Sequence, residues 1–156
     1  MDEQSYLRRV GDCERSLYRL ARSILWNDAD CADAVQQAVF NGWVKRRQLR
    51  DAERFKLWLT RILINECRNI QRRGARQQSI IGALEAEMRA SPPTVADESL
   101  EEALRALPEH YRLPILLHYM EGYPVRDISK ILGIPESRVS DYLYRARRKL
   151  EEALML

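Results

Sequence analysis

Apolar residues recur at intervals of three and four along most of this chain, the spacing that places them on one face of an α-helix. The first stripe runs from Leu7 to Leu25, the second from Cys31 to Trp43 and the third from Phe55 to Ile70. No stretch of useful length alternates apolar and polar residues as a β-strand does. The predicted fold class is therefore all-α.

Charge is segregated along the chain. Residues 61–76 hold five arginines against one acid, Glu66, whereas residues 85–102 hold six acids against a single arginine. The acidic stretch contains Ser-Pro-Pro-Thr at 91–94 and supports at most a short helix through residues 80–88. Because 156 residues suffice for two minimal domains, we interpret this stretch as a linker. The predicted organisation is a three-helix domain at 1–75, a linker at 76–98 and a second helical domain at 99–156.

Composition argues against several classes of function. Cys13, Cys31 and Cys67 lack CxxC spacing and fall on helical patterns, so we interpret them as buried structural thiols. The two histidines lack partners at metal-ligand spacing, and no nucleotide-binding or metalloprotease motif is found. We therefore expect no metal, no cofactor, no small-molecule substrate and no enzymatic activity. Neither an apolar signal segment nor a membrane span is found, which predicts a cytoplasmic protein.

Residues 125–150 have the pattern of a helix-turn-helix. Apolar residues on two short helical runs flank Gly133, which stands where the chain must turn. The second run then exposes cations suited to phosphates and short polar groups suited to base edges. An ordinary solvated helix in an α-hairpin would have the same apolar pattern. The residues expected to contact DNA are Ser137, Arg138, Ser140, Asp141, Tyr144, Arg145 and Arg148.

A second polar stripe lies opposite the apolar stripe of the third predicted helix. Its arginines and asparagines recur at steps of three and four, and together these residue types favour a nucleic acid with unpaired bases. Phe55 and Trp58 could stack on bases, although their core spacing favours burial. The residues of this stripe are Arg61, Asn65, Arg68, Asn69, Arg72 and Arg73.

Three segments together resemble the extracytoplasmic-function (ECF) sigma factors of bacterial RNA polymerase. They are DADCADAVQQAVFNGWVKRR, RFKLWLTRILINECRNIQRR, and residues 107–150, which begin LPEHYRLPILLHYMEG. The resemblance implies that the first domain binds the minus-ten promoter element and the polymerase core, and that the second binds the minus-thirty-five element. It also implies an anti-sigma factor as a partner and a monomer in solution. No nucleotide hydrolysis is implied, because promoter opening can follow from preferential binding of separated strands.

The resemblance assigns roles to residues of the first domain. Asp33, Gln36 and Gln37 match the DxxQE stretch that binds the polymerase core, with Gln37 in place of the usual Glu, and Phe40 lies on the same predicted face. Trp58 and Arg61 match WLxRI, and Asn65 matches the asparagine of RIAxN that faces the melted strand. The minus-ten assignment comprises Arg50, Arg61, Asn65, Arg68, Asn69 and Arg72. Only Arg50 matches the FRGES loop, since residues 49–53 are LRDAE, so no minus-ten base preference is carried over.

The predicted recognition helix departs from the family as well. Where the family commonly has GTVKSRLHRAR, this chain has SRVSDYLYRAR, so Ser140, Asp141 and Tyr142 replace Lys, Ser and Arg. Because a carboxylate can accept a hydrogen bond from cytosine N4, Asp141 predicts an altered minus-thirty-five sequence. A stand-alone helix-turn-helix regulator, which would bind duplex DNA without polymerase, is the alternative function. A helical adaptor with merely solvated basic stripes would lack the steep salt dependence of a DNA-binding protein.

Overall fold

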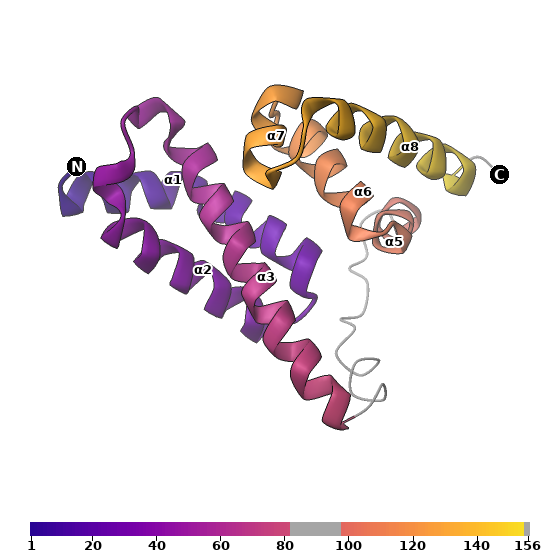
Figure 1. The fold of residues 1–156 in the computed structure, drawn as a ribbon, viewed down its shortest axis with the longest axis horizontal. Helices are drawn as coiled ribbons and strands as arrows, with labels where there is room; N and C mark the ends of the chain where they lie inside the picture. Colours follow the sequence, from indigo (N-terminus) through magenta and orange to yellow (C-terminus); the bar gives the residue numbers. More distant parts are fainter. Residues whose placement is uncertain (82–97, 155–156) are drawn as a thin grey trace. The chain divides into compact units, whose positions relative to one another are not determined.

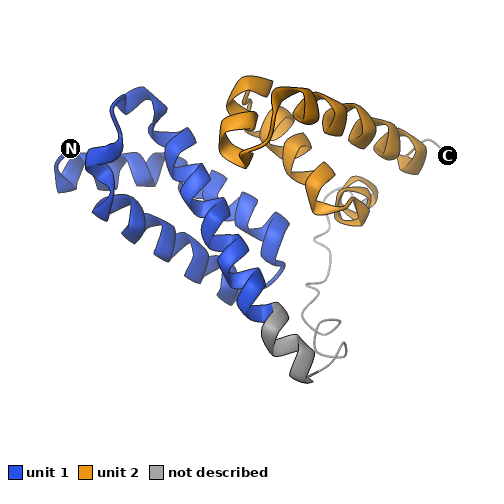
Figure 2. Cartoon of the chain, in the orientation of Figure 1, with its two compact units in different colours: residues 1–91 blue, residues 92–156 orange. Residues whose placement is uncertain are grey.

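The computed structural model describes residues 1–81 and 98–154, and these residues form helices and short connections without a strand. The chain divides into two compact units, Met1–Ser91 and Pro92–Leu156 (Figure 2). The predicted all-α class is confirmed. Most of the short helix predicted through residues 80–88 lies outside the described residues. The domain boundaries predicted at 75 and 99 stay predictions, although the third helix continues to Ile81, within the predicted linker.

The first unit is built from three long helices, each of which packs against the other two (Figure 1). Asp2 and Asn27 cap the first two helices, because their side chains accept hydrogen bonds from the backbone N–H groups of Ser5 and Asp30. The elements are α1 (Glu3–Leu25), α2 (Asp28–Val44), the 3-10 turns η1 (Arg46–Gln48) and η2 (Ala52–Arg54), and α3 (Phe55–Ile81).

The core of the first unit follows the predicted stripes with one correction at the start of α1. Leu7 begins the predicted stripe but is 55% exposed, whereas the neighbouring Tyr6 is 1% exposed. Leu17, Leu20, Leu59 and Leu63 are fully or almost fully buried, as predicted. Tyr6 takes the core position because its hydroxyl, which would be costly to bury alone, donates a hydrogen bond of 2.5 Å to the carbonyl oxygen of Val39. Burial raises the pKa of Tyr6 to about 12.

Gly42 lets α2 approach this tyrosine closely. A Cβ atom built on Gly42 would lie 2.5 Å from the Tyr6 hydroxyl and 3.1 Å from Cδ1 of Leu59. Both neighbours are buried, and the Tyr6 hydroxyl is held by Val39. Glycine is thus required here by packing, even though it lowers helix propensity.

Gly42→Ala is expected to lower the free energy of unfolding of the first unit by about 1–2 kcal/mol, because overpacking outweighs the gain in helix propensity. Urea denaturation followed by tryptophan fluorescence measures this unit, since Trp26, Trp43 and Trp58 all lie in it. In the Tyr6→Phe background the hydroxyl is gone, and the loss should become smaller. Equal losses in the two backgrounds would contradict this account.

The three cysteines lie inside the first unit. Cys13, Cys31 and Cys67 are buried, as predicted. Burial raises the pKa of Cys31 to about 11, so its reactive thiolate form is scarce at neutral pH.

The second unit packs α5, α6 and α7 against its last helix, α8. Pro108 is the N-cap of α6, and Pro114 lies inside this helix. The π-helix η3 follows α6 directly, and the N–H of Glu121 bonds to the carbonyl oxygen of Leu116. The elements are α5 (Glu98–Ala106), α6 (Glu109–Ile115), η3 (Leu116–Met120), α7 (Val125–Leu132) and α8 (Glu136–Leu154).

Helices α7 and α8 form the predicted helix-turn-helix. Gly133 ends α7 in the left-handed conformation, with φ of 70°, as its position predicted. The N–H groups of Gly133 and Ile134 both bond to the carbonyl oxygen of Ser129, and the Ser129 hydroxyl donates to the carbonyl oxygen of Ile134. This closed turn sets the direction of α8, whose buried side is formed by Val139, Leu143 and Ala146.

Candidate nucleic-acid interface

The residues expected to bind the polymerase core lie together on the solvent side of α2. Asp33, Gln36, Gln37 and Phe40 are all exposed, whereas Ala34, Val35 and Ala38 between them are buried. Phe40 is 60% exposed. Val44, which the sequence analysis did not single out, extends this surface by one turn and is 62% exposed. An exposed apolar end beside polar groups is a composition suited to a protein partner.

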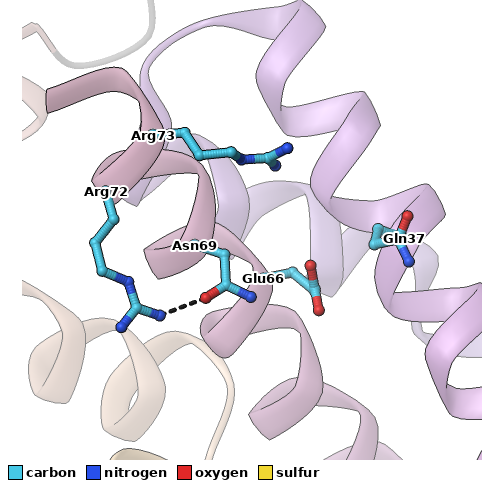
Figure 3. Close-up of a pocket in the computed structure, with 5 residues that line it drawn as sticks. All are labelled: Gln37, Glu66, Asn69, Arg72 and Arg73. Atoms are coloured by element: carbon cyan, nitrogen blue, oxygen red, sulfur yellow. Dashed lines mark hydrogen bonds between the residues drawn. The ribbon is translucent and has the colours of Figure 1, made fainter. Parts of the chain in front are cut away.

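The stripe expected on α3 also faces solvent. Arg61, Asn65 and Arg72 are exposed, and Arg68 lies between them half-buried. At about 100° per residue these positions fall within a band of about 60° around the helix axis. Asn69 is half-buried at the edge of this band, where its Oδ1 accepts a hydrogen bond from Nη2 of Arg72 (Figure 3). The described structure thus places five of the six predicted residues along one side of α3, and Arg73 is exposed beyond Asn69.

Arg50 lies apart from this stripe. It is exposed in the connection between η1 and η2, where the Asp51 side chain caps η2 by accepting from the N–H of Glu53. From Phe55, the start of α3, to Arg72 the helix extends about 25 Å. A nucleic acid that contacts both Arg50 and Arg72 must therefore follow most of the length of α3.

A pocket with a volume of about 580 Å³ lies between α2 and α3 (Figure 3). It brings together Gln37, expected to bind the polymerase core, and Asn69 and Arg72, expected to bind DNA. Arg73 lines it as well, and the side chain of Glu66 extends from α3 toward α2. The predicted protein-binding and DNA-binding surfaces are therefore continuous.

Glu66 belongs to a hydrogen-bonded chain that spacing along the sequence could not reveal. Nε2 of Gln37 donates to Oδ1 of Asn41 over 3.0 Å, and Nδ2 of Asn41 donates to Oε1 of Glu66 over 2.6 Å. These two hydrogen bonds require donors and acceptors to alternate from Gln37 to Glu66. An ionised glutamate at position 37 has no donor and could not bond to Oδ1 of Asn41 in this arrangement. Gln37 thus joins α2 to the carboxylate of α3.

All seven residues predicted to form the DNA-binding surface of α8 are exposed. They lie opposite the buried side of the helix, and two of their arginines have side-chain acceptors four residues earlier. Nε of Arg145 donates to Oδ1 of Asp141 over 3.0 Å, and Nη1 of Arg148 donates to the Tyr144 hydroxyl over 3.1 Å. The exposed residues are Ser137, Arg138, Ser140, Asp141, Tyr144, Arg145 and Arg148.

One further arginine of α8 was not singled out by the sequence analysis as part of the surface. Nη1 of Arg147 donates to the hydroxyl of Tyr119 over 2.8 Å, and Tyr119, in η3, is 54% exposed. The two residues are far apart in the sequence, so periodicity does not connect them. Arg147 therefore lies at the border between α8 and the π-helix.

Two family models match most of the chain. The model described as Sigma-70 region 2 matches residues 9–77, and the model described as Sigma-70, region 4 matches residues 97–150. The chain belongs to the sigma-70 family. The first match covers most of α1, all of α2 and most of α3, and the second covers α7 and most of α8. This sigma factor therefore has the two modules that the resemblance implied, in the same order.

Curated relatives place this sigma factor in the ECF group. The ECF RNA polymerase sigma factor SigM of Mycobacterium tuberculosis is 29% identical over 90% of this chain and 72% of its own length. The "Probable RNA polymerase sigma factor RfaY" of Xanthomonas campestris is 29% identical over 98% of this chain. The chain spans 41% of the length of RfaY. The ECF resemblance is confirmed, and sigma factors are transcription initiation factors.

Two solved structures share the fold. RpoE of Bartonella quintana, solved in complex with the anti-sigma factor NepR, has a TM-score of 0.79 at 21% identity and covers 98% of both chains. CnrH, solved with the cytosolic domain of CnrY, has a TM-score of 0.71 at 26% identity, covering 99% of this chain and 90% of CnrH. Within residues 1–81 and 98–154, no helix is long and apolar enough to cross a membrane. The same residues contain no cluster of potential metal ligands.

Proposed function

We propose that this ECF sigma factor binds the RNA polymerase core through the exposed face of α2 and directs promoter recognition and melting through α3 and α8. The core-binding residues are Asp33, Gln36, Gln37 and Phe40. The observation that carries the proposal is the continuity of this face with the Asn69 and Arg72 side of α3 at the pocket. A chain held there by polymerase has its α3 arginines beside the protein partner, where DNA in the same complex can reach them.

The division of labour between the units follows from their side chains. Asparagine amides on α3 can hydrogen-bond unpaired bases while its arginines neutralise phosphates, so strand separation adds contacts that duplex DNA does not offer. The helix-turn-helix instead presents an intact helix to a major groove. We therefore assign the minus-ten element to a domain at residues 1–75 and the minus-thirty-five element to a domain at 99–156, with 76–98 between them as linker.

An anti-sigma factor is part of the proposal. CnrH was solved with the cytosolic domain of CnrY, and RpoE was solved with the anti-sigma factor NepR. A protein that covered α2 would block the core-binding face described above. We propose regulation of this kind for a factor that acts in the cytoplasm.

Reconstituted transcription tests the proposed function. The full chain is added to sigma-free polymerase core with fragmented genomic DNA, and transcript starts are mapped. Specific starts are expected with the wild-type chain, and few with a variant in which Asp33 and Gln36 are both alanine. A variant with alanine at Asp12 and Glu14, exposed acids of α1, serves as control. Absence of specific starts would overturn the proposal, and tight duplex binding without polymerase would favour the stand-alone regulator.

A further inference from the structure

The Asp141–Arg145 pair occupies the middle of the exposed side of α8. At about 100° per residue, Asp141 lies about 160° around the axis from both Val139 and Leu143, which form the buried side. Arg145 is one turn further along the same side. The side chain of Arg145 is 60% exposed and that of Asp141 is 49% exposed, so both can reach a partner on this surface. In a helix-turn-helix, residues toward the N-terminus of the second helix contact base edges. Asp141 and Arg145 are the sixth and tenth of the nineteen residues of α8.

The pair has a defined geometry. Nε of Arg145 bonds to Oδ1 of Asp141 over 3.0 Å, so the carboxylate engages the Nε side of the planar guanidinium. An arginine held at Nε keeps the N–H groups of its two terminal amino groups as donors. These groups can donate two parallel hydrogen bonds, and guanine offers two acceptors, O6 and N7, in the major groove.

Asp141 and Tyr111 both raise the pKa of Arg145. Hydrogen bonding and charge from Asp141, followed by the same two effects from Tyr111 of α6, raise the pKa of this arginine. The ring of Tyr111 packs edge-on against Tyr142 of α8, with 5.6 Å between the centroids, so it is itself anchored to the recognition helix. The hydrogen bond to Asp141, on the same helix, therefore fixes the position of the Arg145 guanidinium.

From this geometry we infer that Asp141 determines promoter specificity through Arg145, as a positioning residue that presents the guanidinium to one guanine of the upstream promoter element. The inference rests on the proposed function. It assigns the Asp141 carboxylate to Arg145, to which Oδ1 is bonded, rather than to a direct contact with cytosine. It also accounts for an acid on a DNA-binding face, since the paired carboxylate is neutralised by Arg145 and repels phosphates less than a lone one.

Removal of the carboxylate should change both the selectivity of binding and its dependence on salt. An arginine without its acidic partner can turn to a phosphate, so binding becomes less selective and more dependent on salt. The logarithmic salt slope should steepen by about 1 in Asp141→Ala. The preference for guanine at the affected base pair should fall about tenfold, because one well-aligned bidentate pair supplies discrimination of that order.

The test uses polymerase holoenzyme containing the full chain and a promoter library randomised across the upstream element. Sequencing of the selected promoters gives the base preference at each position. We expect Asp141→Asn and Asp141→Ala to weaken the preference at one base pair, and Arg145→Ala to abolish it there. In the Arg145→Ala background, adding Asp141→Ala should change nothing further. Glu152→Ala removes an acid from the exposed part of the same helix and should leave all preferences unchanged.

Two outcomes would overturn the inference alone. One is an unchanged preference in Asp141→Ala. The other is a preference that changes with Asp141 even when Arg145 is alanine, which would indicate direct contact with a base. Exposed pairs of this spacing stabilise helices only weakly, so a purely structural role would alter melting temperature slightly and base preference not at all. If the wild-type holoenzyme selects no upstream sequence, both this inference and the proposed function of α8 are wrong.

Discussion

Arg112→Ala is expected to lower the free energy of unfolding of the second unit by about 3 kcal/mol. Arg112 is 6% exposed, and its Nη1 donates to the carbonyl oxygens of Leu107, over 2.8 Å, and Arg105, over 3.3 Å. These carbonyls lie at the C-terminal end of α5, where a cation is favourable. Burial lowers the pKa of Arg112, and the charge of Glu109 opposes that effect. Alanine would remove the donor and leave a cavity beside the end of α5.

Hydrogen exchange measures this effect separately in each unit. Amide protection in α5, α6 and α8 should fall in Arg112→Ala, while tryptophan fluorescence, which reports only the first unit, should show an unchanged urea midpoint. Arg138→Ala, which removes an exposed arginine of α8, is the matched control and should leave protection as it is. If the free energy of unfolding falls by less than about 1 kcal/mol, the carbonyl groups at the end of α5 must bond to other groups or to water in the variant.

A double substitution on α3, Arg61→Ala with Arg72→Ala, is expected to make the salt dependence of promoter binding shallower. Each arginine that neutralises a phosphate contributes nearly one unit to the slope of log affinity against log salt, so the slope should fall by about 2. Both residues are exposed on the same stripe of α3, about sixteen ångströms apart along the helix axis. The predicted effect is a general loss of affinity rather than a change in base preference.

Open-complex formation by the holoenzyme at several salt concentrations gives the slope. A double variant of exposed arginines on α1, Arg8→Ala with Arg15→Ala, changes the net charge equally and should keep the wild-type slope. Asn65→Ala should instead leave the slope unchanged and reduce opening, since an uncharged amide releases no counterion. If the α1 and α3 double variants alter the slope equally, the proposal that the α3 stripe contacts DNA is wrong.

Sequence periodicity was sufficient to predict the helices and the surfaces that they expose. Apolar spacing placed α1, α2, α3 and α8, and the single glycine at 133 located the turn before the recognition helix. These features depend on a few neighbouring residues, because helix pitch and the left-handed conformation of glycine are local properties of the backbone. The buried cysteines and the exposure of Asp33, Asn65 and Arg145 followed from the same spacing.

Contacts between helices were decided only by the tertiary structure. Tyr6 rather than Leu7 enters the core because Val39, 33 residues away, accepts its hydrogen bond and Gly42 makes room for it. The link from Asn41 to Glu66 and the bond from Arg147 to Tyr119 likewise join separate helices. Periodicity shows which face of a helix is buried, but not which side chain of another helix meets it, since that depends on how the helices cross. Helical period placed Asp141 and Arg145 one turn apart on the α8 surface, and the structure showed that they are bonded.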